Sequence, residues 1–283
     1  MTHRQLTSLL AKNYPPGEAR AVASWLMEAA FGLTTTDIVM GRDALLGSDD
    51  CLLMEQMAAR LLTGEPVQYV VGKAFFGDMT LSVRPGVLIP RPETAELCRW
   101  VDSCWGEESR PRRAVDICTG SGCIALWMKK HHPGAAVEAW DIMETPLTVT
   151  RENAREARLD IAVRRQDALR LPDDRAEWDV IVSNPPYVRL SERATMAHHV
   201  VDFEPHEALF VDDSEATVFY HSIGHYALGA LKKGGTLFFE LNDTTAHSVA
   251  DELAAMGFGN VELRQDQFGR TRFLRATLSN STP

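Results

Sequence analysis

The chain has 283 residues, 45% hydrophobic and 24% charged, so it can bury a core and lies outside the disordered, collagenous and low-complexity classes. Its 39 acidic and 29 basic residues give a formal net charge of -10, which argues against nucleic-acid binding by bulk phosphate neutralisation. No stretch is apolar for long enough to cross a membrane, and residues 1–30 lack the pattern of a signal peptide. We therefore expect a cytoplasmic, monomeric globular protein that forms no stable complex with nucleic acid or membrane.

Metal ligation is not expected from the cysteines or histidines. The five cysteines are odd in number and form no C-x-x-C pair, which favours reduced thiols over a zinc ribbon or a disulfide framework. His221 and His225 lie four residues apart on an expected helix, but no third ligand accompanies them.

Apolar residues recur at helical spacing in three segments of the N-terminal region. The segments end near Pro15-Pro16-Gly17, at Gly32 and at Gly64. The third has its apolar stripe at Leu53, Met57 and Leu61 and candidate N-caps at Ser48 and Asp49. The pattern predicts a small helical domain over residues 1–68.

Short β-prone runs follow at residues 69–71, 79–81 and 87–89, with Gly72, Gly77 and Pro85-Gly86 between them. We interpret residues 69–90 as a β-hairpin linker.

Beyond the linker, the pattern alternates between strands and helices. The expected strands are 114–118, 137–141, 162–164, 180–183, 236–241, 261–263 and 272–276, and the expected helices are 124–130, 146–157, 217–231 and 244–256. Continuously apolar strands that alternate with helices are typical of a mainly parallel sheet covered on both faces. The last two strands, around Gly269, read as an antiparallel pair that completes the sheet.

A glycine-rich loop, Asp116-Ile117-Cys118-Thr119-Gly120-Ser121-Gly122, joins the first of these strands to its helix. Glycines let the backbone approach a ligand, and the helix start presents free N–H groups. Gly120, Gly122 and Ala125 also match the dinucleotide pattern G-x-G-x-x-G/A, so the loop by itself does not separate NAD from S-adenosylmethionine.

Two acidic residues follow the next two strands. Asp141 lies 19 residues after Gly122 (141 − 122), where a carboxylate accepts hydrogen bonds from the ribose of an adenosine cofactor. Asp167, followed by Ala168, could accept from an adenine amino group; the alternative is a loop aspartate that caps a turn.

The segment Asn184-Pro185-Pro186-Tyr187 follows the strand at 180–183. Two prolines remove N–H donors, so the segment offers backbone carbonyls and the Asn184 amide as acceptors. Such a site suits a planar NH₂ group, and Tyr187 can cover its flat face. The alternative is a proline turn with a packing tyrosine.

These features resemble the release-factor protein-(glutamine-N5) methyltransferases, a family of class I S-adenosylmethionine-dependent methyltransferases. The resemblance spans nearly the whole chain. Besides the glycine loop and residues 184–187, it includes Leu88-Ile89-Pro90-Arg91-Pro92-Glu93-Thr94, Glu204-Pro205-His206-Glu207-Ala208-Leu209 and Asp266-Gln267-Phe268-Gly269-Arg270-Thr271-Arg272-Phe273.

The resemblance implies a Rossmann-like methyltransferase domain over residues 91–283, with a mainly parallel seven-stranded sheet. It implies methylation of the glutamine of the Gly-Gly-Gln motif in peptide-chain release factors, with S-adenosylmethionine as donor and S-adenosylhomocysteine as product. The helical domain would recognise the partner protein.

Site residues are carried over from the family by position. Asn184, Pro185 and Tyr187 would be catalytic, and these three with Pro186 would bind the substrate. The cofactor-binding set would be Asp116, Cys118, Thr119, Gly120, Ser121, Gly122, Asp141, Asp167, Ala168 and Asn184. At Cys118 the family usually has glycine, so a side chain must fit there, at a cost of roughly 1 kcal/mol or more if the backbone needs a positive φ.

Two alternatives remain open from the sequence. An N6-adenine or RNA base methyltransferase would use the same Asn184–Tyr187 pocket, but the net charge of -10 disfavours it. A catalytically silent cofactor-binding adaptor would have lost its activity through Cys118.

Overall fold

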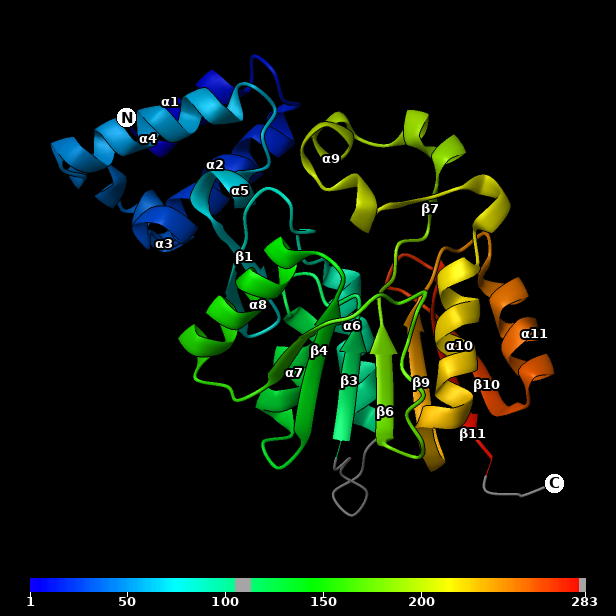
Figure 1. Cartoon of the computed structure of the whole chain (residues 1–283). Coiled ribbons are helices and arrows are strands. Elements are labelled where there is room, and N and C mark those ends of the chain that lie inside the picture. The colour runs from blue at the N-terminus through cyan, green and yellow to red at the C-terminus, as the bar shows by residue number, and fades with distance from the viewer. Residues whose placement is uncertain (105–112, 280–283) are drawn as a thin grey trace. The chain divides into compact units, whose positions relative to one another are not determined.

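The computed structural model describes residues 1–104 and 113–279, which form two compact units (Figure 1). Unit 1 comprises Met1–Ala74, Val83–Pro85 and Met196–Phe203, and unit 2 comprises Phe75–Ser82, Gly86–Thr195 and Glu204–Pro283. The hairpin expected as a separate linker is therefore divided between the units, and one later segment belongs to unit 1. No helix among the described residues is both long and apolar enough to cross a membrane.

Unit 1 is helical. Its elements are α1 (His3–Leu10), α2 (Pro16–Phe31), α3 (Thr35–Val39), the 3₁₀ helix η1 (Arg42–Leu45), α4 (Ser48–Leu61), α5 (Val67–Val71) and α9 (His198–Phe203). Thr2 and Gln5 form a capping box at α1, and α2 has Pro16 in its first turn and Gly32 as its C-cap. The core of the unit is apolar and includes Leu6, Leu10, Leu26, Met27, Met54 and Leu61.

The third helical segment differs in detail from its prediction. Gly47, rather than Ser48 or Asp49, is the N-cap of α4, and it makes no side-chain capping bond. The buried face carries Met54, Ala58 and Leu61, whereas Leu53 is 41% exposed. The prediction was right for Leu61, and Met57 packs against the core, but it was wrong for Leu53. Leu52, Leu53 and Met54 are all apolar, and periodicity alone does not choose between them.

A short hairpin is present, but two of the three predicted strands were wrong. The hairpin pairs β1 (Lys73–Phe76) with β2 (Met79–Ser82). Residues 69–71 belong to α5, which follows Pro66 and ends at Gly72. Residues 87–89 form no strand, since the Ile89 N–H donates to the Glu204 carboxylate instead of a neighbouring strand.

Unit 2 contains a seven-stranded sheet in the order β10-β11-β9-β6-β3-β4-β5. The strands are β3 (Arg113–Ile117), β4 (Ala136–Asp141), β5 (Ala162–Arg165), β6 (Trp178–Ser183), β9 (Leu231–Glu240), β10 (Phe258–Gln265) and β11 (Thr271–Leu278). All pairs from β9 to β5 are parallel, and β11 is antiparallel to both β9 and β10. The predicted Rossmann-like fold is confirmed.

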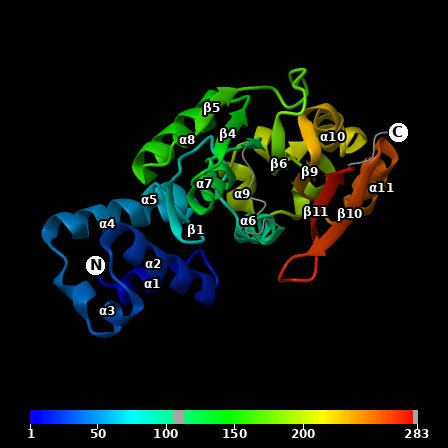
Figure 2. The ribbon, with the colours of Figure 1, turned by 90° about the horizontal axis from the view of Figure 1, so that it is seen from below.

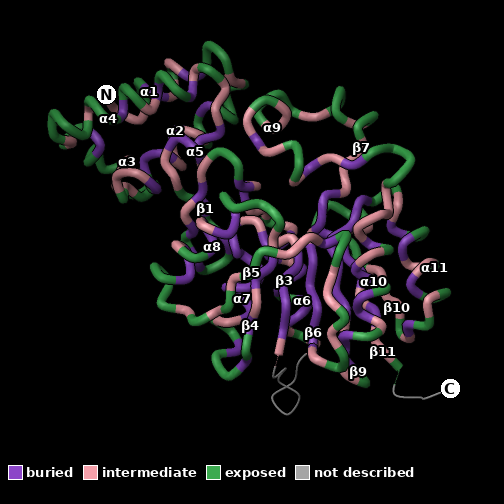
Figure 3. Tube along the Cα trace, in the orientation of Figure 1, coloured by how far each residue is buried: buried purple, intermediate pink, exposed green. Residues whose placement is uncertain are grey.

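Helices cover both faces of this sheet, as Figure 2 shows with α6 and α7 on one side and α10 on the other. The helices are α6 (Pro92–Cys104), α7 (Cys123–His131), α8 (Glu144–Ala157), α10 (Val218–Ala230) and α11 (Ala246–Met256). Alternate strand residues serve the two faces: Val180 and Val182 pack with α6 and α7, and Ile181 packs with α10 and α11. Most residues of the central strands β3 and β6 are therefore buried (Figure 3).

The remaining short elements of unit 2 lie in the sequence between β6 and α10. They are β7 (Val188–Arg189), η3 (Leu190–Thr195), η4 (His206–Ala208), β8 (Phe210–Val211) and η5 (Asp213–Glu215), with β7 paired to β8. Because β3, β4, β6 and β9 run parallel, the residues that follow them meet at one edge of the sheet. Ligands bind at this edge in open α/β sheets.

Candidate active site

Asp116 organises the glycine loop from below. Its carboxylate accepts hydrogen bonds from the Thr119 hydroxyl at 2.5 Å and from the Ala125 N–H at 3.1 Å, so it ties the loop to the start of α7. The residue is fully buried, and burial raises its pKa to about 7. Its other oxygen, Oδ1, has no hydrogen-bond partner among the described residues.

The loop backbone passes through left-handed conformations at three positions. Gly120 has φ 59° and Gly122 has φ 83°, and a Cβ at Gly122 would lie only 2.8 Å from the Thr150 side chain. Cys118, with φ 64°, adopts the same region although it is not glycine. The backbone at Cys118 therefore does adopt the positive φ that would favour glycine at this position.

Replacing Cys118 tests the strain directly. We expect Cys118→Gly to raise the free energy of unfolding by up to about 1 kcal/mol, since glycine adopts a positive φ without a Cβ penalty. Cys118→Val should lower it by more than about 1 kcal/mol, since a β-branched residue is least tolerated there. Urea titrations of the three proteins measure both changes, and a less stable glycine variant would contradict the expectation.

Asp141, at the end of β4, lies beside the loop as predicted from its spacing. Its Oδ2 accepts from the Gly120 N–H and its Oδ1 from the Met143 N–H, both at 3.0 Å. Burial raises its pKa, and these backbone hydrogen bonds oppose that rise. The carboxylate is thus held rigidly where β3 and β4 end next to each other.

Asp167 and Ala168 make local contacts after β5. Asp167 Oδ1 accepts from the Leu169 N–H at 2.8 Å, which is the turn-capping contact considered as its alternative. Ala168 is buried against α10, where its carbonyl accepts from the Ser222 hydroxyl at 2.7 Å.

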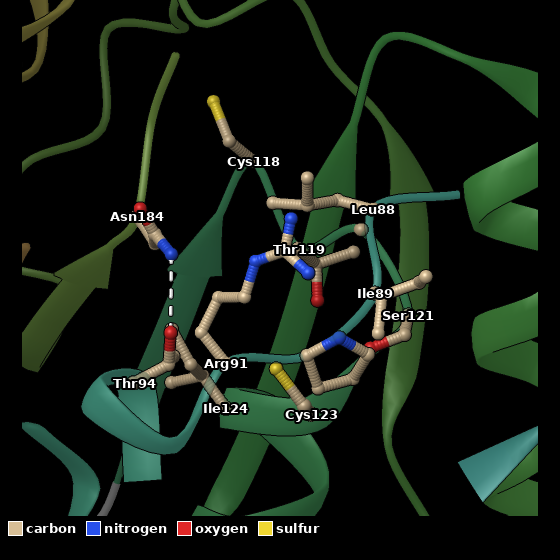
Figure 4. A pocket seen from close by; sticks show the side chains of 12 residues that line it. Leu88, Ile89, Arg91, Thr94, Cys118, Thr119, Ser121, Cys123, Ile124 and Asn184 are labelled. Atoms are coloured by element: carbon tan, nitrogen blue, oxygen red, sulfur yellow. Dashed lines mark hydrogen bonds between the residues drawn. The ribbon is translucent and has the colours of Figure 1, made fainter. Parts of the chain in front are cut away.

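Asn184 follows β6, and its side chain points to α6. The Asn184 amide nitrogen donates to the Thr94 hydroxyl at 3.2 Å, as the dashed line in Figure 4 shows. Pro185 and Pro186, which follow it in the chain, are both buried. The hydroxyl of Tyr187 donates to Glu240 Oε1 at 3.1 Å, and burial raises the Tyr187 pKa.

Two small cavities meet at Asn184. The first, of about 30 Å³, is lined by Leu88, Ile89, Pro90, Arg91, Thr94, Cys118, Thr119, Gly120, Ser121, Cys123, Ile124 and Asn184. The second, of about 40 Å³, is lined by Leu88, Arg91, Asn184, Tyr187, Val188, Ala208, Leu209 and Glu240. Leu88, Arg91 and Asn184 belong to both, so they separate two spaces that each suit a chemical group rather than a whole ligand.

The cavities bring together part of the predicted site. Cys118, Thr119, Gly120, Ser121 and Asn184 line the first cavity, and Asn184 and Tyr187 line the second. The other predicted residues line neither cavity: Asp116, Gly122, Asp141, Asp167, Ala168, Pro185 and Pro186.

Three residues of the site carried no functional assignment from the sequence. Glu204 is buried and pairs with Arg91 at 2.5 Å, and it also accepts from the Ile89 N–H at 3.1 Å, so it holds the shared wall. Thr94 and Glu240 are both buried at the edge of the sheet. Glu240, at the end of the apolar strand β9, could have been noticed in the sequence, because glutamate is rarely buried unless its carboxylate has a partner.

The fold and the site are those of a class I methyltransferase. The mainly parallel seven-stranded sheet carries a glycine loop after β3, an acid at the end of β4 and Asn-Pro-Pro-Tyr after β6. A methyltransferase from Pyrococcus furiosus has the same fold, with a TM-score of 0.54 at 18% identity over 78% of this chain and 97% of that one. So has the hMettl16 catalytic domain in complex with MAT2A 3'UTR hairpin 6, with a TM-score of 0.55 at 21% identity over 73% and 77%.

The sequence comparisons narrow the class to a family. Residues 3–72 match a family model described as PrmC N-terminal domain, and residues 106–204 match one described as Methyltransferase small domain. Curated release factor glutamine methyltransferases from Bacteroides thetaiotaomicron and Flavobacterium psychrophilum are 39% and 33% identical, covering 93% and 96% of this chain and 94% and 96% of theirs. This chain belongs to the release factor glutamine methyltransferase family and is a methyltransferase.

Proposed function

We propose that this enzyme transfers a methyl group from S-adenosylmethionine to the side-chain amide nitrogen, N5, of the glutamine in the Gly-Gly-Gln motif of release factors. The family membership supports the reaction and the substrate. The observation that carries the proposal is the Asn184 carboxamide, which stands between two cavities with its nitrogen held by Thr94. One cavity would take the reacting part of the cofactor and the other the substrate amide.

The residues around the loop fit S-adenosylmethionine. A Cβ built on Gly120 would meet nothing within 4 Å, so there is room for a ligand against its backbone. The carboxylate of Asp141 suits the ribose hydroxyls of the cofactor, and the first cavity would hold the methionine end against Cys118 and Thr119. When bound, the cofactor supplies a methyl group on a positively charged sulfur.

Orientation of the substrate amide would account for most of the catalysis. An amide nitrogen is a weak nucleophile, because its lone pair is delocalised into the carbonyl. The Asn184 side-chain oxygen and the Pro185 carbonyl would accept the two amide hydrogens and direct the nitrogen toward the methyl group. Tyr187 would shield this arrangement from water. The nitrogen becomes strongly acidic once methylated and can lose its proton without a dedicated base.

Asp141 provides a test of the cofactor site. We expect Asp141→Ala to weaken S-adenosylhomocysteine binding about tenfold or more, because a charged acceptor of ribose hydroxyls is lost. Asp173→Ala is the control, since Asp173 is 83% exposed and pairs with Arg175, and its effect should be smaller. Calorimetric titration of both variants gives the comparison, and equal losses would argue against the role of Asp141.

We propose the helical unit as the module that recognises the release factor. The sequence predicts this module over residues 1–68, and α9 belongs to the same compact unit. Its match to the PrmC N-terminal domain over residues 3–72 supports a separate N-terminal domain. The methyltransferase module would then comprise residues 91–283 apart from Met196–Phe203.

The decisive experiment uses methyl-labelled S-adenosylmethionine with a release factor from the same organism. A copy of the factor with its loop glutamine replaced by alanine, a DNA sample and an RNA sample serve as parallel substrates. We expect label on the intact factor alone. Label on nucleic acid would overturn the proposal in favour of a base methyltransferase, and cofactor binding without any label would indicate a silent adaptor.

A further inference from the structure

A chain of hydrogen bonds links Asn184 to the buried side chains of Thr94 and Glu240. The Asn184 nitrogen donates to the Thr94 hydroxyl, which donates to Glu240 Oε2 at 2.6 Å. The Tyr187 hydroxyl donates to the other oxygen of the same carboxylate. Thr94 is 2% exposed and Glu240 is 1% exposed, so no bulk water competes for these groups.

The direction of each hydrogen bond follows from the chemistry of the carboxylate. An ionised carboxylate accepts hydrogen bonds and donates none, so the hydroxyls of Thr94 and Tyr187 must both direct their protons to Glu240. Thr94 then has only lone pairs to offer Asn184, which must present its NH₂ group to them. The oxygen of the Asn184 carboxamide is left on the side away from Thr94.

Burial raises the pKa of Glu240 overall, and the hydrogen bonds and the cation around its carboxylate oppose that rise. The hydrogen bonds from Thr94 and Tyr187 and the positive charge of Arg272 lower the pKa, and the charge of Glu93 raises it. The Arg272 guanidinium lies 5.7 Å from the centre of the Tyr187 ring. A cation therefore lies beside Tyr187, one of the two residues that donate to the carboxylate.

We propose that Thr94 and Glu240 are positioning residues of the methyl transfer, which hold the Asn184 carboxamide with its oxygen toward the substrate amide. This inference rests on the proposed function. A carboxamide can turn by 180° at little cost in shape, and the turned form would present NH₂ to an NH₂ group and repel it. Thr94 and Glu240 exclude the turned form, although neither needs to touch the substrate.

Thr94→Val tests the proposal, because valine keeps the shape of threonine and removes its hydroxyl. We expect kcat for the release factor to fall about tenfold, since the productive form of the amide is no longer selected. The affinity for S-adenosylhomocysteine should stay within about twofold. Thr94→Ser, which retains the hydroxyl, should recover most of the lost turnover.

Thr277→Val is the matched control. Thr277 lies in β11 opposite Thr236, four residues before Glu240 in β9, whereas Phe273 is the β11 residue opposite Glu240. The same loss of a hydroxyl there should leave kcat unchanged.

A double variant separates positioning from a general structural effect. If Thr94 acts only through Asn184, then Thr94→Val should cause no further loss of kcat in an Asn184→Ala background. Additive losses, an unchanged kcat in the single variant, or a parallel loss of cofactor affinity would each overturn the proposal.

A spectroscopic measurement tests the orientation independently of the substrate. The side-chain amide signals of Asn184 in a ¹⁵N correlation spectrum are assigned by their disappearance in Asn184→Ala. We expect Thr94→Val to shift them and to speed their exchange with water, and Thr277→Val to do neither. Unmoved signals would refute the hydrogen bond between Asn184 and Thr94 even if the release factor proved to be the substrate. Shifted signals would support this hydrogen bond even if the release factor proved not to be the substrate.

Discussion

Asn184→Ala is expected to lower turnover on the order of a hundredfold while cofactor affinity changes by no more than about threefold. The carboxamide stands between the two cavities, and its oxygen is the proposed acceptor for one hydrogen of the substrate amide. Its loss removes the group that orients the substrate amide in the transition state. The first cavity loses only one of its twelve lining residues, so cofactor affinity should change little. Single-turnover rates with labelled donor and calorimetric titration of S-adenosylhomocysteine measure the two quantities separately.

The comparison also distinguishes a catalytic residue from a structural one. A thermal melt of Asn184→Ala should remain within a few degrees of the parent protein, because Thr94 keeps its bond to Glu240 in the variant. Turnover equal to that of the parent protein would remove Asn184 from the mechanism. A large drop in melting temperature would instead attribute the lost activity to the fold.

Glu204→Ala is expected to lower the free energy of unfolding by about 2 to 3 kcal/mol and to reduce turnover as well. The carboxylate of Glu204 holds both the Arg91 guanidinium and the Ile89 N–H, and its side chain is 1% exposed. Removing it leaves a buried N–H without its acceptor and frees the segment of residues 88–91. That segment forms the wall shared by the two cavities, so substrate and cofactor would both lose a defined surface.

Glu144→Ala supplies the control for this change. Glu144 pairs with Arg151 at 3.2 Å, but the two side chains are 67% and 49% exposed, so the pair should contribute less than about 1 kcal/mol. Chemical denaturation of the three proteins should therefore rank Glu204→Ala well below the other two. If both variants lost the same stability, the buried pair would not be what holds the wall.

The alternation of strands and helices was predictable because it depends on local patterns. Buried parallel strands must be apolar along their whole length, and their helices must be apolar on one face, so both leave a periodic signal. The glycine loop and Asp141 were predictable for a related reason, since strands that run parallel bring their carboxyl ends to one edge. The errors fell where periodicity was too short to decide, at residues 69–71 and 87–89, and where three apolar residues adjoin in α4.

The family resemblance drew attention to two motifs without showing how they cooperate. Residues 88–94 and 204–209 are separated by more than a hundred positions in the chain, yet Glu204 of one holds Arg91 and Ile89 of the other. Pairings of this kind depend on which loops the folded sheet brings together. They have no periodicity of their own in the sequence.

The sequence by itself determined the fold class, the glycine loop, Asp141 and the Asn184–Tyr187 segment, because each follows from local backbone and side-chain chemistry placed on consecutive elements. Only the tertiary structure decided that Cys118 adopts a positive φ and that Asp167 accepts a hydrogen bond from the Leu169 N–H. It also decided that Thr94 and Glu240, 146 residues apart, share one hydrogen bond behind Asn184. That contact exists because α6 and β9 pack together in the core, and the orientation of one amide then depends on side chains that no local pattern connects.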